Sequence, residues 1–97
     1  MDRREYDINI TVNGRQVTKV LIDAHYEEKH RKSISDDVIV KLVKLLGGGT
    51  YPIQVKNELF EYYATDGLVL DDKKYKLVWL LENDQIYIGV VNAYRRK

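Results

Sequence analysis

The sequence predicts an α+β fold in the order β-β-α-β-β-β, with an amphipathic helix packed on one face of a largely antiparallel twisted sheet. Three observations predict it: segments whose apolar residues alternate as in strands, turn-forming dipeptides between them, and one stretch with helical periodicity. The chain has 97 residues, a length that suits one domain, so we expect residues 1–97 to form a single α+β domain.

A hairpin is expected near the start of the chain. Apolar and polar residues alternate over residues 6–12, as in a half-buried strand. Asn13-Gly14 follows, and this dipeptide favours the positive φ angles of a tight type I′ turn. Residues 17–22 are expected to form the returning strand.

A helix is predicted between Ser35 and Gly47. Ser35 fits the N-cap, and Asp36 and Asp37 lie in the first turn, where negative charge is favourable. Apolar residues recur at helical spacing on one face, and Gly47-Gly48-Gly49 ends the helix.

The rest of the chain is predicted to form strands. We expect them over residues 59–65, 74–81 and 85–94, with turns at Asp66-Gly67 and Asn83-Asp84. Residues 77–81 are apolar without alternation, which indicates a central strand covered on both faces.

The composition excludes several classes of protein. The absence of cysteine excludes a disulfide scaffold, a thiolate zinc site and a cysteine nucleophile. Apolar runs are shorter than the roughly 18 residues of a membrane span, and the start lacks a signal-peptide core, so we expect no membrane partner and a cytoplasmic location. The formal net charge is +1, so an anion site must come from local clustering.

The first candidate cluster contains both histidines, His25 and His30, with Lys29 beside them. Five positions on a helix rotate by about 140°, so the histidines would not share a face, which argues against a zinc site. We expect no metal and no cofactor. His25 and Lys29 would share a face, and an imidazole beside an ammonium group can serve as a general base. The alternative is a solvated surface segment without function.

The second candidate cluster is the string Asn92-Ala93-Tyr94-Arg95-Arg96. Alternation predicts that Asn92 and Tyr94 continue the apolar face of Ile88 and Val90, with Arg95 on the other face. A polar continuation of an apolar face would suggest a cleft at the strand end. The alternative is a frayed basic end with Tyr94 packed at the sheet edge.

Tyrosine is unusually frequent, with eight tyrosines against one phenylalanine. Five of them lie in strands predicted after the helix: Tyr62, Tyr63, Tyr75, Tyr87 and Tyr94. Aromatic residues on a sheet can stack nucleic-acid bases, although high β-propensity alone explains their presence. The single tryptophan, Trp79, is expected in the core.

The order of these features resembles one known family. A His-x₄-His segment with basic residues precedes an amphipathic helix, and the last strand carries Val-Val-Asn-Ala-Tyr-Arg-Arg. This arrangement is similar to the small metal-independent RNase domains of the barnase–EndoU–colicin–RelE superfamily, which occur as toxins. The resemblance covers roughly residues 25–96.

The resemblance implies RNA as the substrate and a cognate antitoxin or immunity protein as a partner. His30 or His25 would act as base or acid, Lys29 and Arg95 would stabilise charge, and Tyr94 would be an acid or a stacking platform. Thr65, Asn92 and Arg96 would bind the substrate.

Two further functions fit the same residues. A non-enzymatic α+β interaction module would keep the two clusters apart and expose an apolar patch elsewhere. A simple nucleic-acid binder would keep the basic cluster but tolerate the loss of either histidine.

Overall fold

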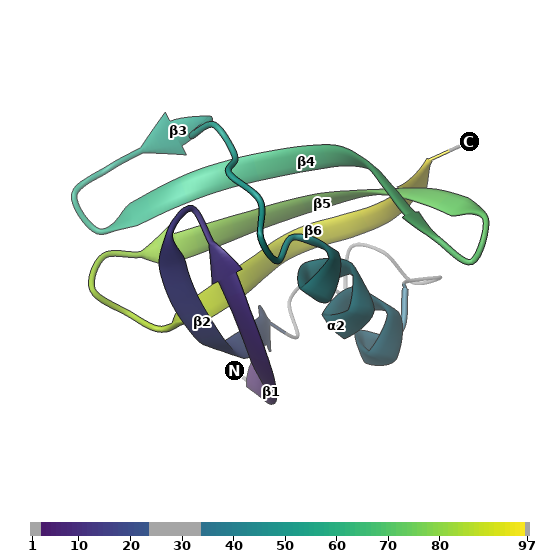
Figure 1. Cartoon of the computed structure of the whole chain (residues 1–97), viewed down its shortest axis with the longest axis horizontal. Helices are drawn as coiled ribbons and strands as arrows, with labels where there is room; N and C mark the ends of the chain where they lie inside the picture. Colours follow the sequence, from purple (N-terminus) through teal and green to yellow (C-terminus); the bar gives the residue numbers. More distant parts are fainter. Residues whose placement is uncertain (1–2, 24–33, 97) are drawn as a thin grey trace.

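The computed structural model describes residues 3–23 and 34–96, shown in Figure 1. Its elements are β1 (Arg3–Val12), β2 (Arg15–Asp23), α2 (Asp36–Leu45), β3 (Val55–Lys56), β4 (Phe60–Leu70), β5 (Lys73–Glu82) and β6 (Tyr87–Arg96). The described residues therefore form an α+β fold, as predicted. The two-residue strand β3 was not predicted, because it is too short to show a pattern.

One mixed sheet contains all the described strands, in the order β1-β2-β6-β5-β4-β3. Neighbouring strands are antiparallel except β2 and β6, which run parallel, with Ile22 opposite Val90. The prediction of a largely antiparallel sheet is thus correct for every pair but this one. In Figure 1, β4, β5 and β6 extend side by side, and the hairpin of β1 and β2 is set steeply against them.

Local turn signals located the first hairpin correctly. Asn13 and Gly14 have φ angles of 52° and 75°, so both central turn residues are left-handed, as a type I′ turn requires.

The predicted turn at Asp66-Gly67 is wrong, because β4 continues through it. There the register with β5 shifts between Thr65 and Leu68, and Gly67 has φ of 74°, which is typical of a β-bulge.

A second bulge lies in β6. It places the residues that follow Val91 on the opposite side of the sheet from the one predicted. Trp79 of β5 lies opposite Val90, whereas its neighbour Val78 lies opposite Asn92, so Val91 is an extra residue. Ala93 therefore continues the buried face of Val90, and Asn92 lies on the opposite face. The prediction that Asn92 and Tyr94 continue the apolar face, with Arg95 on the other face, is wrong, because strict alternation does not survive an inserted residue.

The core lies on one side of the sheet, where α2 packs against β1, β2 and β4. On β5, alternate residues from Tyr75 to Leu81 are buried, while Val78 and Leu80 between them are only half-buried. The expectation that this strand is covered on both faces is therefore wrong for the described part of the chain. We call the face of β4, β5 and β6 opposite the core the open face.

The start of α2 is fixed to β1 by an ion pair. Ser35 is the N-cap, as predicted, and its hydroxyl accepts a hydrogen bond from the Val38 amide at 3.3 Å. Arg4 binds Asp36 through two nitrogens, with Nη2 2.9 Å from Oδ1, and the Tyr6 hydroxyl donates to the same carboxylate. The hydrogen bond from Arg4 lowers the pKa of Asp36.

Replacing Asp36 with asparagine is expected to lower the free energy of unfolding at neutral pH by about 1–3 kcal/mol, because Arg4 loses its charged partner. The pKa of Asp36 is lower in the folded chain than in the unfolded chain. Its contribution is thus fully present above the unfolded value of about 4 and is lost as pH falls through the folded value. Urea denaturation from pH 7 downward should show the wild type and the variant converging in acid.

Asp37→Asn is the matched control for this prediction. Asp37 lies in the same helical turn, but its side chain is 76% exposed, and among the described residues its ion-pair partner is Lys41. Exposed pairs contribute little to stability. Equal losses for the two variants, or an Asp36→Asn loss that persists in acid, would contradict the role assigned to the ion pair.

Candidate nucleic-acid interface

Polar and basic side chains gather at one end of the open face. Tyr94 of β6 lies opposite Lys76 of β5, and Arg96 lies opposite Lys74. Because side chains two positions apart share a face, all four lie on the same face as Asn92. We call Lys74, Lys76, Asn92, Tyr94 and Arg96 the basic end.

Two contacts order the basic end. The Lys76 ammonium lies 5.9 Å from the centre of the Tyr94 ring, at the outer limit of a cation–π contact. Nη2 of Arg96 lies 3.5 Å from Oδ2 of Asp66, and both of these side chains are about half exposed. A pair this exposed is weak, so a phosphate could compete with Asp66 for the guanidinium.

Asn92 contributes an unsatisfied polar atom to this end. Its Oδ1 is buried and accepts no hydrogen bond from any residue that the structure describes, although Asn92 as a whole is half-buried. A buried acceptor without a partner costs about 1–3 kcal/mol. Such groups are uncommon in native proteins, and each needs an explanation, for example a functional role.

The predicted site residues divide between the two faces of the sheet. Asn92, Tyr94 and Arg96 lie together on the open face. Arg95 lies opposite Tyr75, on the core face, and is exposed. Thr65 lies on the core face too, where its Oγ1 accepts a hydrogen bond from Nε1 of Trp79 at 3.0 Å. Lys74 and Lys76 were not singled out from the sequence, although they alternate along a strand that is otherwise apolar.

The predicted catalytic residues His25, Lys29 and His30 lie outside the described residues. The chain does, however, leave β2 at the end of the sheet that carries the basic end. Since β2 and β6 are parallel and Ile22 lies opposite Val90, β2 ends beside the point where β6 continues to Asn92.

Aromatic side chains gather at the other end of the open face. Tyr62 lies opposite Leu80, and Phe60 lies opposite Glu82. Tyr87 precedes the buried Ile88, and its hydroxyl donates to the Glu82 carboxylate. We call Phe60, Tyr62 and Tyr87 the aromatic end. Two other strand tyrosines, Tyr63 and Tyr75, are instead buried in the core.

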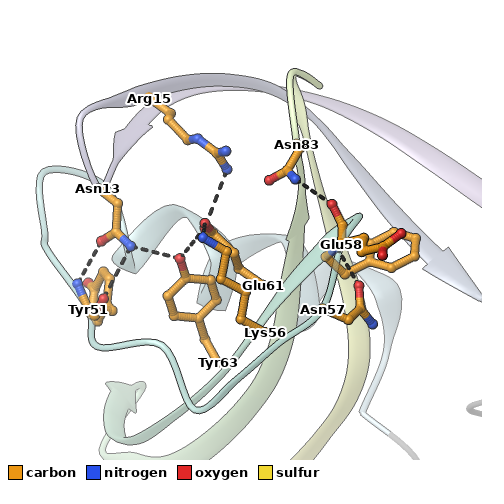
Figure 2. A network of polar contacts seen from close by, with 10 residues as sticks. Asn13, Arg15, Tyr51, Lys56, Asn57, Glu58, Glu61, Tyr63 and Asn83 are labelled. Atoms are coloured by element: carbon orange, nitrogen blue, oxygen red, sulfur yellow. Dashed lines mark hydrogen bonds and ion pairs between the residues drawn. The ribbon is translucent and has the colours of Figure 1, made fainter.

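A separate polar network lies on the core side and joins the hairpin tip to β4 (Figure 2). Nδ2 of Asn13 donates to the Tyr63 hydroxyl at 3.0 Å, and that hydroxyl donates to Oε1 of Glu61 at 2.8 Å. Arg15 and Lys56 lie 3.7 and 3.9 Å from the Glu61 carboxylate. Burial, with the hydrogen bond to Glu61, raises the pKa of Tyr63 to about 12. The phenol therefore stays protonated and holds the hairpin tip in place.

The same network fixes the loop after α2. Oδ1 of Asn13 accepts from the Tyr51 amide at 2.6 Å, and Nδ2 donates to the Tyr51 carbonyl at 3.1 Å. Each polar atom of the asparagine side chain thus has a partner within the protein. Nη1 of Arg15 is buried without a hydrogen-bond partner among the described residues and has only the 3.7 Å ion pair with Glu61. Because the other side chains of this network are hydrogen-bonded to one another, we treat it as a structural connection and not as the first choice for a binding site.

Comparison with protein-family models, with curated proteins and with solved structures returns no match to this chain. Within residues 3–23 and 34–96, no group of three or more His, Cys, Asp and Glu side chains is placed to hold a metal ion. Across the same residues, no helix has the length and apolar character needed to cross a membrane. The open face is therefore the candidate functional site.

Proposed function

We propose that this chain is a metal-independent endoribonuclease-like domain that cleaves RNA at the basic end of the open face. The observation that carries the proposal is the convergence of Asn92, Tyr94 and Arg96 with Lys74 and Lys76 on one face. A phenol, an amide and cations in one place are suited to binding and protonating a phosphodiester.

The chemistry requires a base, an acid and positive charge. In the proposed reaction, His25 or His30 removes the proton from the 2′-hydroxyl, and the 2′-oxygen attacks the adjacent phosphorus. The bond to the 5′-oxygen breaks, and Tyr94 gives that oxygen its proton. The products are a 2′,3′-cyclic phosphate and a 5′-hydroxyl.

The basic residues have separate roles in this scheme. Lys76 and Lys74 stabilise the negative charge that develops on the phosphate oxygens, together with Lys29. This assignment gives the lysines the charge-stabilising role that the resemblance gave to Arg95, because Arg95 and Tyr94 project from opposite faces of β6. Arg96 and Asn92 hold the substrate.

The proposal includes a cellular setting. An enzyme that cuts cellular RNA acts in the cytoplasm, and the cell that makes it needs an antitoxin or immunity protein. We propose that such an inhibitor covers the basic end, where its acidic side chains would meet the lysines.

Cleavage of RNA tests the proposal directly. We expect the purified protein to cut total RNA or a tRNA pool, to do so in the presence of EDTA, and to leave 2′,3′-cyclic phosphate ends. The His25→Ala/His30→Ala double variant should lose this activity, whereas Lys41→Gln, an exposed change on α2, should keep it. Intact RNA in every assay, or equal cleavage by the double variant, would contradict the proposal.

A second candidate function is a non-enzymatic interaction module. It is favoured by exposed apolar side chains around β3, where Ile53, Val55 and Leu59 are 44%, 60% and 58% exposed. Val55 lies opposite Tyr62, so Val55 extends the aromatic end onto β3. A stable complex with another protein, without any RNA cleavage or binding, would favour this candidate.

A further inference from the structure

The aromatic end has no role in the cleavage chemistry, yet its side chains are arranged as a surface. The rings of Phe60 and Tyr62 lie 6.1 Å apart at 55° to each other. A built Cβ at Gly89 would lie 2.8 Å from Cδ1 of Leu80, so the leucine uses the space that the glycine leaves. Leu80 therefore packs over Gly89 of β6, in the same row of the sheet as Tyr62 of β4.

The sequence of β5 is apolar on the open face as well as on the core face, as expected for a strand that is covered on both sides. Residues 77–81 are all apolar, but the described elements bury only the alternate residues that face α2. Val78 and Leu80, on the open face, remain half-buried, and Val91 beside them is 44% exposed. No element within residues 3–23 and 34–96 covers this apolar face, and an apolar sheet face left open in this way is typical of a binding surface.

We propose that the aromatic end stacks unpaired bases, and that the open face as a whole binds single-stranded RNA, which is then the substrate of the proposed RNase. Sites for single-stranded nucleic acids combine aromatic side chains, which stack on bases, with cations that contact the phosphates. The open face has both, at its two ends. This inference rests on the proposed function for the substrate, but it is tested separately by binding.

The separation of the two ends sets the length of the bound strand. Tyr62 lies opposite Leu80, and Tyr94 lies opposite Lys76, four positions earlier on β5. At about 3.4 Å per residue, the two tyrosines are about 14 Å apart along the strand. Stacked nucleotides advance by about 3.4 Å each, so a few nucleotides span this distance.

The residues between the two ends leave room for the strand. Ala64, Val78 and Asn92 form the row across β4, β5 and β6 that separates Tyr62 from Tyr94. Ala64 and Val78 have shorter side chains than Tyr62, Leu80 and Lys76, which flank them. Asn92 also carries the acceptor without a partner, and a turn of its amide toward the surface would let it bond a base.

The charged side chains determine where the phosphates and the bases of the RNA lie on this surface. Lys74, Lys76 and Arg96 attract phosphates to the basic end, whereas Glu82 lies at the aromatic end and binds Tyr87. Phosphates are therefore disfavoured over the aromatic end, and bases are expected there. Cations and aromatic rings on the same face favour a nucleic acid over an apolar protein surface as the occupant.

Binding of an oligonucleotide that cannot be cleaved tests this inference. The probe is a fluorescent single-stranded RNA of eight nucleotides with 2′-O-methyl riboses, which lack the attacking hydroxyl. Fluorescence anisotropy should show that Tyr62→Ala/Tyr87→Ala weakens binding by about 10-fold or more. Tyr62→Phe/Tyr87→Phe keeps the rings and should bind within about twofold of the wild type.

The alanine variant could lose binding because it misfolds, so a second measurement uses the wild-type protein. Addition of the same probe should shift the methyl NMR signals of Val78 and Leu80, while those of the buried Ile39 in α2 stay in place. Unshifted signals, equal binding by the alanine variant, or tighter binding of a duplex of the same sequence would overturn the inference. A protein partner that binds this face while the probe does not would also overturn it.

Failure of this inference is distinguishable from failure of the proposed function. Binding of the probe without cleavage of natural RNA would support the single-strand surface and contradict the RNase. Cleavage of natural RNA that is unchanged by Tyr62→Ala/Tyr87→Ala would support the RNase and contradict the surface.

Discussion

Replacement of Trp79 by alanine is expected to lower the free energy of unfolding by about 3–5 kcal/mol, because it leaves a large cavity at the centre of the core. Trp79 is fully buried. Its ring stacks on Tyr63 at 4.1 Å and meets Tyr51 edge-on at 5.6 Å. The substitution therefore removes contacts from both sides of the ring, together with the hydrogen bond from Nε1 to Thr65.

Urea denaturation followed by far-UV circular dichroism would measure this loss, since the substitution removes the fluorescent indole. Trp79→Phe keeps a ring against Tyr63 and should lose less. Val69→Ala is the control, because Val69 is 55% exposed on β4 and should change stability by no more than about 0.5 kcal/mol. A loss below about 1 kcal/mol for Trp79→Ala would contradict the placement of Trp79 at the centre of the core.

Among the described residues, the largest expected effect on activity follows from Tyr94→Phe. If the phenol protonates the leaving 5′-oxygen, its removal should lower kcat for RNA cleavage by about 100-fold or more. The ring remains, so its contact with Lys76 is kept, and the thermal stability should stay within about 0.5 kcal/mol of the wild type. Single-turnover cleavage of a tRNA pool by the wild type and the variant measures the difference.

Tyr94→Ala separates protonation from stacking. It removes the ring as well as the hydroxyl, so it should lower kcat like the phenylalanine variant and also raise KM. If Tyr94→Phe instead cleaves at the wild-type rate and only Tyr94→Ala is impaired, the tyrosine is a stacking residue and not the acid. Strong destabilisation by Tyr94→Phe would show a structural role.

The elements predicted correctly are those fixed by a few neighbouring residues. The Asn13-Gly14 turn depends on two residues that accept positive φ, and the helix start depends on the Ser35 hydroxyl and an amide three positions later. These interactions form within one turn of chain, so their signals are present in the local sequence. The burial of Trp79 was also predictable, because it lies in the longest apolar run.

The features that were missed depend on partners far away in the sequence. The bulge at Val91 is defined by its pairing with β5, and it moves Asn92 to the face that alternation alone did not predict. The parallel pairing of β2 with β6 joins residues almost seventy positions apart. The Asp66-Gly67 dipeptide carries a turn signal, but the strand pairing on both sides converts it to a bulge.

The candidate site was predicted in part for the same reason. Asn92, Tyr94 and Arg96 were identified from one string near the end of the chain. Lys74 and Lys76 join them only because β5 lies beside β6, and no local pattern links the two strands. The grouping of Phe60 and Tyr62 with Tyr87 likewise requires the sheet order.

The position of β6 between β2 and β5 has a consequence for the order of folding. Every other described element precedes β6 in the chain, so while the protein is being synthesised the β1–β2 hairpin and the β3–β4–β5 meander are two separate sheets. Only insertion of β6 joins them, and the long loop that this closes makes the step slow compared with hairpin formation. The same strand carries Asn92, Tyr94 and Arg96. A nascent chain that lacks β6 therefore has neither a continuous sheet nor the basic end, and the proposed activity arises only in the last step of assembly.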